Sequence, residues 1–344
     1  MDLFALTRRL VDVESVSGNE GAVGELLAQE LMALGYAVRK IPVAARRFNL
    51  YAYALPPAKP ESSLAYPEIV FSTHMDVVPP FFPSSEDREN IYGRGACDAK
   101  GIIAAQIGAA ELLRKENVAA GLLFVVGEER DSLGAKIANQ LAEELHGGRA
   151  KFLINGEPTE NRVAIASKGT LRVQLTASGK MAHSAYPELG DSAIVKLVHA
   201  IERLLKMPLP AHPEFGRCTL NVGVIEGGRA PNVIPDYARA QLLYRLIGSS
   251  EELRRKIVES VGELAKVEFT LEIPFIKLRS VDGLPTMVAA FTTDIPALTH
   301  WGQPVLLGPG SIHVAHTERE FVAKKDLLEA VELYCKVAKG LLKG

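Results

Sequence analysis

Apolar side chains divide the first half of the chain into short continuous runs and stretches with helical spacing. Residues 2–35 carry apolar side chains at helical spacing, which predicts two amphipathic helices. Ser17 and Glu20 have the spacing of a capping box, so we expect them to begin the second helix. Further along, the runs IVFST at 69–73 and LLFVV at 122–126 are almost wholly apolar, as in strands covered on both faces.

Predicted strands and helices alternate up to residue 154. The strands are expected at 49–55, 68–73, 122–126 and 151–154, with helices after Lys100 and after Leu133. This alternation predicts an α/β fold with a helix-covered, mostly parallel sheet.

From about Lys168 the pattern changes to β-α-β-β-α-β, the order of a ferredoxin-like α+β domain. The expected elements are, in order, 169–178, 191–207, 219–226, 237–246, 251–261 and 267–273. After Ser280, one more apolar strand and a helix over 325–342 follow, and we expect both to rejoin the first sheet. The chain is therefore divided into a domain of residues 1–167 plus 279–344 and an inserted domain of residues 168–278.

Composition and charge argue against two classes of partner, nucleic acids and membranes. The 344 residues include 39 lysines and arginines against 41 aspartates and glutamates, and no basic patch occurs, so we expect no nucleic-acid partner. No run approaches the ~20 apolar residues of a membrane span, and we expect no membrane partner. The scattered cysteines Cys97, Cys218 and Cys335 offer no disulfide framework, which favours a cytoplasmic location.

Acidic and imidazole side chains follow directly on three of the predicted strands. They are His74, Asp76, Glu128, Glu129 and Glu157. In an open α/β sheet the carboxyl ends of the strands meet in one crevice, so we expect these groups to face one another.

The glycine-rich loop IYGRGACDAKG, at 91–101, adds one more carboxylate, Asp98. It does not match a phosphate-binding loop, because Asp98 stands where a dinucleotide loop needs glycine and Gly101 where a P-loop needs serine or threonine. Cys97, beside that aspartate, lacks the electropositive surroundings of a nucleophilic thiol.

Crowded carboxylates repel one another, and bound divalent cations are the usual means of keeping them ionised. Each residue alone would also fit an ordinary loop, turn or surface position. Together, these groups suffice for two cations, about 3.5–4 Å apart, that share a bridging carboxylate. The set is His74, Asp98, Glu129, Glu157 and one more histidine.

Six segments, in this order, resemble the M20 family of metallopeptidases and deacylases, which includes acetylornithine deacetylase, succinyl-diaminopimelate desuccinylase, aminoacylase-1 and carboxypeptidase G2. The segments run from residue 72 to about residue 321 and are STHMDVVP, YGRGACDAKG, VVGEERDSLGA, INGEP, SGKMAHSAYPELGDSAI and AHTEREFV. The resemblance implies that the first domain is catalytic and that the inserted domain is a lid and dimerisation domain, so a homodimer is expected.

The resemblance further implies two divalent metal ions and five ligands for them. His74 and Glu157 hold one ion. Glu129 and His316 hold the other, and Asp98 bridges the two. Zinc is favoured by this mixture of imidazole and carboxylate ligands, with cobalt or manganese as alternatives.

Two details of these loops also follow from the resemblance. His313 is the alternative to His316 as the last ligand, and His316 is preferred because an acidic residue, Glu320, follows it at the family's spacing. The peptide bond between Asp98 and Ala99 is expected to be cis.

Five more residues receive roles from the resemblance. Asp76 accepts the second N–H of the imidazole two residues before it, and Glu128 is the general base. His183 reaches a neighbouring active site across the dimer and stabilises the oxyanion. Asn232 and Arg245 bind polar groups of the substrate, including its carboxylate.

The activity implied is hydrolysis of an N-acyl amino acid, in the manner of an acetylornithine deacetylase. A dipeptidase or carboxypeptidase acting on short peptides, or a succinyl-diaminopimelate desuccinylase, is the alternative within the family. A metal-binding protein without catalysis is the alternative outside it, and the presence of Glu128 beside the ligands disfavours it.

Overall fold

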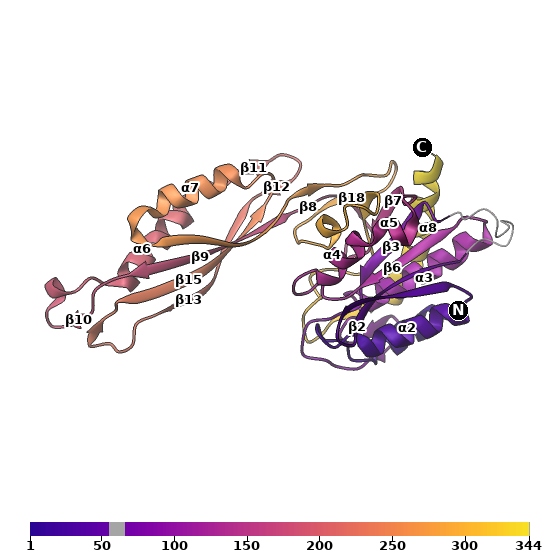
Figure 1. Ribbon diagram of the computed structural model, residues 1–344, viewed down its shortest axis with the longest axis horizontal. Coiled ribbons are helices and arrows are strands. Elements are labelled where there is room, and N and C mark those ends of the chain that lie inside the picture. The colour runs from indigo at the N-terminus through magenta and orange to yellow at the C-terminus, as the bar shows by residue number, and fades with distance from the viewer. Residues whose placement is uncertain (55–65, 344) are drawn as a thin grey trace. The chain divides into compact units, whose positions relative to one another are not determined.

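The computed structural model describes residues 1–54 and 66–343, and the chain forms two compact units (Figure 1). The first unit consists of Met1–Ile165, Leu278–Met287 and Thr293–Gly344, and the second of Ala166–Lys277 and Val288–Thr292. Each unit has an apolar core of its own. The strand expected at 49–55 ends at Leu55, which lies outside the described residues.

A mixed sheet forms the centre of the first unit. Its middle strands are parallel and lie in the order β6 (Ala120–Val125), β3 (Ile69–His74), β7 (Phe152–Asn155) and β19 (Gln303–Leu306). Antiparallel strands flank them: β1 (Ala37–Ala44) and β2 (Arg47–Tyr53) beside β6, and β8 (Val163–Ser167) beside β19. Every residue of β3 and β6 is buried, as expected for apolar runs covered on both faces.

Helices cover both faces of this sheet. One face packs against α1 (Leu3–Val11), α2 (Gly21–Ala33), α3 (Lys100–Lys115) and α8 (Lys324–Lys343). The other face packs against α4 (Leu133–Gln140) and α5 (Ala142–His146). Successive residues of a strand point to opposite faces, so Phe71 belongs to the first core and Val70 to the second. None of the described helices is both long and apolar enough to cross a membrane.

The expected capping box at the start of α2 is wrong. Glu20 is the residue that precedes the helix, and no side chain caps the helix there. The Ser17 hydroxyl instead donates to Oδ2 of Asp76 at 2.6 Å, and the Glu20 carboxylate accepts two hydrogen bonds from Arg47, at 2.6 and 2.7 Å. Charged partners from distant segments therefore occupy both side chains that a capping box would use.

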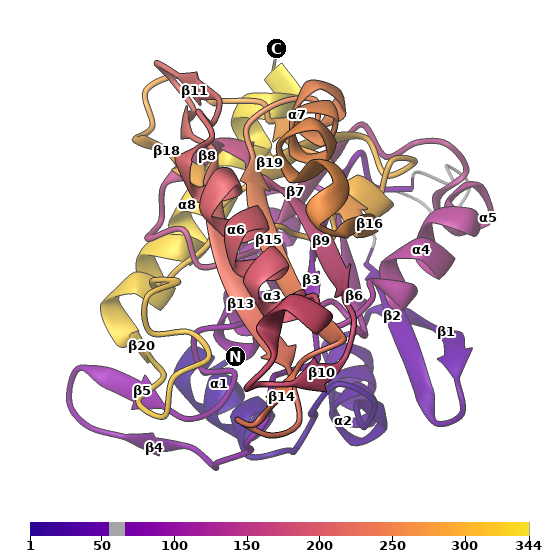
Figure 2. The ribbon, with the colours of Figure 1, turned by 90° about the vertical axis from the view of Figure 1, so that its left-hand side faces the viewer.

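The second unit is a four-stranded antiparallel sheet with two helices. In chain order its elements are β9 (Gly169–Ser178), α6 (Ala193–Lys206), β13 (Thr219–Gly227), β15 (Tyr237–Leu246), α7 (Glu251–Val261) and β16 (Lys266–Ile273). The strands lie in the order β13-β15-β9-β16, and both helices lie on one face (Figure 1; Figure 2). This is the ferredoxin-like arrangement predicted from the β-α-β-β-α-β pattern.

The C-terminal part of the chain returns to the first unit, as expected. Two strands rather than one join the mixed sheet: β18 (Thr286–Ala289) pairs with β8, and β19 pairs in parallel with β7. A small sheet of β4 (Ser85–Glu86), β5 (Asn90–Tyr92) and β20 (Phe321–Ala323) then sets the start of α8 beside the glycine-rich loop.

Candidate functional site

The loops that carry the predicted acidic residues leave one edge of the central sheet. β3 ends at His74 and lies between β6 and β7, to both of which it is parallel. The loop with Glu128 and Glu129 follows β6, and Glu157 follows β7. Parallel neighbours place their carboxyl ends side by side, so these side chains approach one another.

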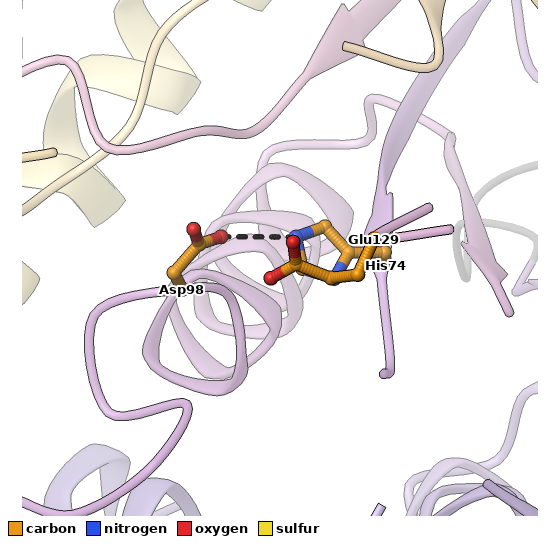
Figure 3. A group of neighbouring side chains, drawn as sticks. All are labelled: His74, Asp98 and Glu129. Carbon is orange, nitrogen blue, oxygen red and sulfur yellow. Dashed lines mark hydrogen bonds and ion pairs between the residues drawn. The ribbon is translucent and has the colours of Figure 1, made fainter. Parts of the chain in front are cut away.

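The closest group consists of His74, Asp98 and Glu129, each of which offers one potential ligand atom within 4.8 Å of those of the other two (Figure 3). Nε2 of His74 lies 2.9 Å from Oδ1 of Asp98. Nε2 of His316 lies 2.7 Å from Oε1 of Glu129 and 3.4 Å from Oδ2 of Asp98. Each carboxylate oxygen of Asp98 therefore faces a different histidine, as a carboxylate shared by two cations requires.

The last loop brings His316 rather than His313 to these carboxylates. The backbone of His316 has a φ of 64°, in the left-handed region that disfavours residues other than glycine. Such a conformation persists only where the surrounding structure holds it, and it occurs often at functional sites.

The glycine-rich loop aims the carboxylate of Asp98 through its backbone. Gly95 has a φ of 88°, which glycine adopts without strain. A Cβ atom on Gly101 would lie 2.3 Å from the carbonyl oxygen of Ala96, so only glycine fits at this start of α3. The peptide bond between Asp98 and Ala99 is cis, which confirms that expectation.

The Asp76 carboxylate has a different partner from the one expected. Nδ1 of His74 donates to the backbone carbonyl of Asp76 at 2.9 Å, while its distance to the nearer carboxylate oxygen is 3.6 Å. That carboxylate instead accepts the backbone N–H groups of Gly127, Glu128 and Glu129, at 2.9, 3.1 and 3.2 Å. Asp76 thus orients the imidazole through its backbone carbonyl, and it holds the loop after β6 through its side chain.

Burial and charge set the proton affinities of these carboxyl groups. Burial, followed by the charge of Glu157, raises the pKa of Glu128 well above its ordinary value. Burial, followed by the charge of Asp98, does the same to Glu157, which is 4 % exposed. Burial alone would also raise the pKa of Asp98, but hydrogen bonds from His316 and His74 lower it.

Asp294 is an acidic residue near these groups that the sequence pattern did not reveal. It is 2 % exposed, and neither carboxyl oxygen has a hydrogen-bond partner in the described part of the chain. Burial raises its pKa to about 6, and its charge in turn raises the pKa of Glu128 and Glu157. In the sequence it occurs in TTDIP, before a short 3₁₀ helix at Ile295–Ala297, where aspartate is an ordinary residue.

The donor groups of this crevice fit divalent cations. Burial would lower the pKa of His74, but the Asp98 carboxylate raises it, and hydrogen bonds with Asp98 and Glu129 raise the pKa of His316 to about 10. Both imidazoles therefore bind protons in the cation-free protein, since the carboxylates around them require positive charge. Imidazole nitrogen with carboxylate oxygen is a donor set that suits Zn²⁺, and Mn²⁺ or Co²⁺ as well.

The remaining predicted residues, His183, Asn232 and Arg245, lie in the second unit. His183 is in a two-residue strand, β10 (Ala182–His183), which pairs with β14 (Val233–Ile234), directly after Asn232. The side chains of His183 and Asn232 are both exposed. Arg245 lies near the far end of β15, is partly buried, and donates from Nη1 to the Thr170 hydroxyl at 2.8 Å.

Comparison with known proteins finds relatives over the whole chain. A family model described as a peptidase dimerisation domain matches residues 165–268. A probable carboxypeptidase of Aspergillus fumigatus is 37 % identical over 384 residues, covering 99 % of this chain and 87 % of the relative. A peptidase M20 domain-containing protein of Schizosaccharomyces pombe is 36 % identical over 352 residues, covering 97 % and 83 %.

Solved structures share the fold at lower identity. The aminopeptidase PepT of Bacillus cereus is 24 % identical, with a TM-score of 0.79, and the match covers 99 % of this chain and 98 % of that one. A Bacillus subtilis protein described as a dinuclear metal-binding peptidase of the M20 family is 16 % identical, with a TM-score of 0.66, over 98 % of both chains.

Proposed function

This chain belongs to the M20 family of metallopeptidases, and we propose that it hydrolyses the amide bond beside the carboxylate end of a short peptide, using two divalent cations. The observation that carries the proposal is the Asp98 carboxylate, which has one oxygen toward His74 and the other toward His316. The relatives at 36–38 % identity that are named probable carboxypeptidases support a peptide as the substrate.

Five residues would hold the cations. His74 and Glu157 would hold one, Glu129 and His316 would hold the other, and Asp98 would serve both. When bound, the cations would polarise the carbonyl of the amide and lower the pKa of a water molecule between them. Zinc is the preferred ion for these ligands, and cobalt or manganese would serve in the same place.

Glu128 is the proposed general base. Its raised pKa means that it binds a proton more readily than an exposed glutamate, as a group that accepts a proton from water near neutral pH must. The same carboxyl group then gives that proton to the leaving amine, so the nitrogen departs as a neutral amine. Asp76 keeps this base in place, since its carboxylate accepts the backbone N–H of Glu128.

We propose that the protein is a homodimer formed through the second unit. β13 is an edge strand of its sheet, and the adjacent helix α6 exposes Val195, Val198 and Leu205 by 52 %, 49 % and 62 %. An uncovered strand edge beside exposed apolar side chains is typical of a surface that pairs with another chain.

The positions of His183 and Arg245 support a role for the second chain. About eight residues of β15 separate the end near His183 from Arg245, which at ~3.3 Å per residue amounts to about 26 Å. One small substrate cannot touch both residues of a single chain. We therefore propose that His183 stabilises the oxyanion in the site of the other subunit. Asn232, which lies beside His183, and Arg245 would then bind polar groups of two different substrate molecules.

A cytoplasmic location is proposed from the cysteines. Cys97, Cys218 and Cys335 are buried, and all three are unpaired thiols. Thiols in this state persist in a reducing compartment.

A deacylase of N-acyl amino acids, such as an acetylornithine deacetylase, is the second candidate. An N-acyl amino acid also has an amide beside a carboxylate, so the ligands and base described here suit it equally. The residues that contact the acyl group or the penultimate residue decide between the two.

A hydrolysis panel tests the proposal. The metal-free protein, reloaded with Zn²⁺, Co²⁺ or Mn²⁺, is assayed with dipeptides, tripeptides, N-acetylornithine, N-succinyl-diaminopimelate and N-acetylated neutral amino acids. We expect metal-dependent release of the C-terminal amino acid from peptides. Faster hydrolysis of N-acetylornithine would establish the second candidate, and no hydrolysis with any loaded metal would refute both.

A further inference from the structure

A buried carboxylate, Glu320, occupies the concave side of the glycine-rich loop. It is 1 % exposed, and its Oε1 atom accepts the backbone N–H groups of Gly95, Cys97 and Asp98, at 2.9, 3.1 and 3.1 Å. Several backbone N–H groups that converge on one point form an anion-binding concavity, as in phosphate-binding loops. Here the bound anion is a side chain of the protein itself.

Glu320 forms an ion pair with Arg94. Nη1 of Arg94 lies 2.6 Å from Oε2 of Glu320, and both side chains are fully buried. The guanidinium also donates from Nε to the carbonyl of Pro80 at 3.2 Å and lies 4.7 Å from the centre of the Phe82 ring. Oε2 therefore binds the arginine, and Oε1 accepts the hydrogen bonds of the loop.

These contacts connect the two loops that carry predicted metal ligands. Glu320 follows His316 by four residues, and it binds the N–H of Asp98 itself. We propose that Glu320 is a positioning residue, which aims the shared carboxylate of Asp98 at the two cations and sets its distance from His316. This inference rests on the proposed di-metal function.

An ion pair of Glu320 and Arg94 with a purely structural role would respond to substitution differently from a positioning residue. If Glu320 only balanced the charge of Arg94, its loss would lower the stability of the protein and leave the geometry of the metal ligands unchanged. As a positioning residue it controls a ligand through the backbone, and loss of such supporting hydrogen bonds costs roughly 10–100-fold in metal affinity.

The test uses three variants of the full chain, Glu320→Gln, Glu320→Asp and Glu318→Gln. Glutamine keeps the shape but places an amide N–H₂ or a neutral oxygen against the loop. Aspartate keeps a negative charge near Arg94 and withdraws the carboxylate by one methylene, so it provides a second variant in which the charge is retained. Glu318 is exposed, two residues earlier in the same loop, and serves as the control.

Metal affinity is measured by competition with a chromophoric chelator, and the visible spectrum of the Co²⁺-loaded protein reports ligand geometry. Urea unfolding of the metal-free proteins is recorded in parallel. Those Glu320 variants that are folded should bind Co²⁺ and Zn²⁺ about 10–100-fold more weakly than the wild type, and their Co²⁺ spectrum should be altered. Glu318→Gln should match the wild type in both measurements.

Two results separate the failure of this inference from that of the proposed function. Wild-type protein that binds fewer than two cations would refute the proposed function. Wild-type protein that binds two cations, together with folded Glu320→Asp or Glu320→Gln protein of equal affinity and unchanged Co²⁺ spectrum, would overturn the positioning role alone.

Discussion

The substitution Asp76→Asn separates two roles of this carboxylate. It could accept from the imidazole of His74, or it could hold the loop after β6 by accepting backbone N–H groups. Oδ1 of Asp76 accepts the backbone N–H groups of Gly127 and Glu128, while Oδ2 accepts the backbone N–H of Glu129 and the O–H of Ser17. Asparagine keeps one oxygen, which can still serve the first two donors. Its N–H₂ group replaces Oδ2 and faces the backbone N–H of Glu129, donor against donor.

The expected loss follows from this geometry. Two hydrogen bonds to a charged acceptor are removed, and such bonds contribute about 1.5–3 kcal/mol each. The Ser17 hydroxyl can rotate and accept from the new amide, so one of the two losses is partly recovered. We therefore expect the free energy of unfolding of the metal-free protein to fall by about 2–4 kcal/mol.

Hydrogen exchange at single amides is the decisive assay. The amide of Glu129 should exchange roughly 30-fold faster in Asp76→Asn, the factor that about 2 kcal/mol produces, whereas the amides of Gly127 and Glu128 should change less. Urea unfolding measures the accompanying loss of stability. Asp131→Asn is the control, because within residues 1–54 and 66–343 that exposed carboxylate in the same turn accepts only from the backbone N–H of Leu133.

The contrary result is equally specific. If the carboxylate of Asp76 acted on the imidazole of His74, the Glu129 amide would keep its protection in Asp76→Asn. An unchanged exchange rate at Glu129, with wild-type stability, would refute the role assigned to this side chain.

Four further predictions follow from burial and charge. Glu128→Gln should bind two cations like the wild type and hydrolyse peptides about 10²–10⁴-fold more slowly, and an active variant would exclude Glu128 as the base. In the metal-free protein the pKa of His316 is raised from 6.5 to about 10, so its contribution to stability is present below about pH 6.5 and lost toward pH 10. Cation binding at pH 8 must then release protons, which calorimetry in buffers of different ionisation enthalpy measures; binding without release would contradict this. The pKa of Asp294 is raised from 3.8 to about 6, so this residue lowers the stability of the metal-free protein as pH rises from about 4 to 6. Asp294→Asn should therefore stabilise that protein by about 2–3 kcal/mol at pH 7 and by little at pH 3, and equal urea midpoints for variant and wild type at pH 7 would contradict it. Val198→Glu on α6 should sediment as a monomer, whereas Val258→Glu on α7, with the same 49 % exposure, should remain a dimer; two dimeric variants would place the interface elsewhere.

Much of the fold was predictable because burial leaves a local pattern. The runs that form β3 and β6 are apolar at successive positions, and both are buried along their whole length. In β1, by contrast, only Ile41 is buried, so its sequence does not predict a strand. β1 forms because the edge of β2 offers it backbone hydrogen bonds, and that edge exists only in the folded sheet.

Ser17 shows why a correct local pattern can give a wrong contact. Its spacing from Glu20 suits a capping box, which is a contact between near neighbours. In the folded chain the Ser17 hydroxyl donates to the charged Oδ2 of Asp76 at 2.6 Å, and α2 begins only at Gly21, so Ser17 does not occupy the position that caps the helix.

By itself, the sequence determined where the strands end and which acidic and imidazole groups follow them. That was sufficient to predict a crevice with His74, Asp98, Glu129 and Glu157, because the carboxyl ends of parallel strands share one edge. Only the tertiary structure decided which groups meet the buried backbone N–H donors of the loops. Asp76 and Glu320 are held by donors whose positions depend on packing between segments more than 50 and 200 residues apart. No local pattern records such distances, and for this reason Asp294 and the role of Glu320 emerged only from the folded chain.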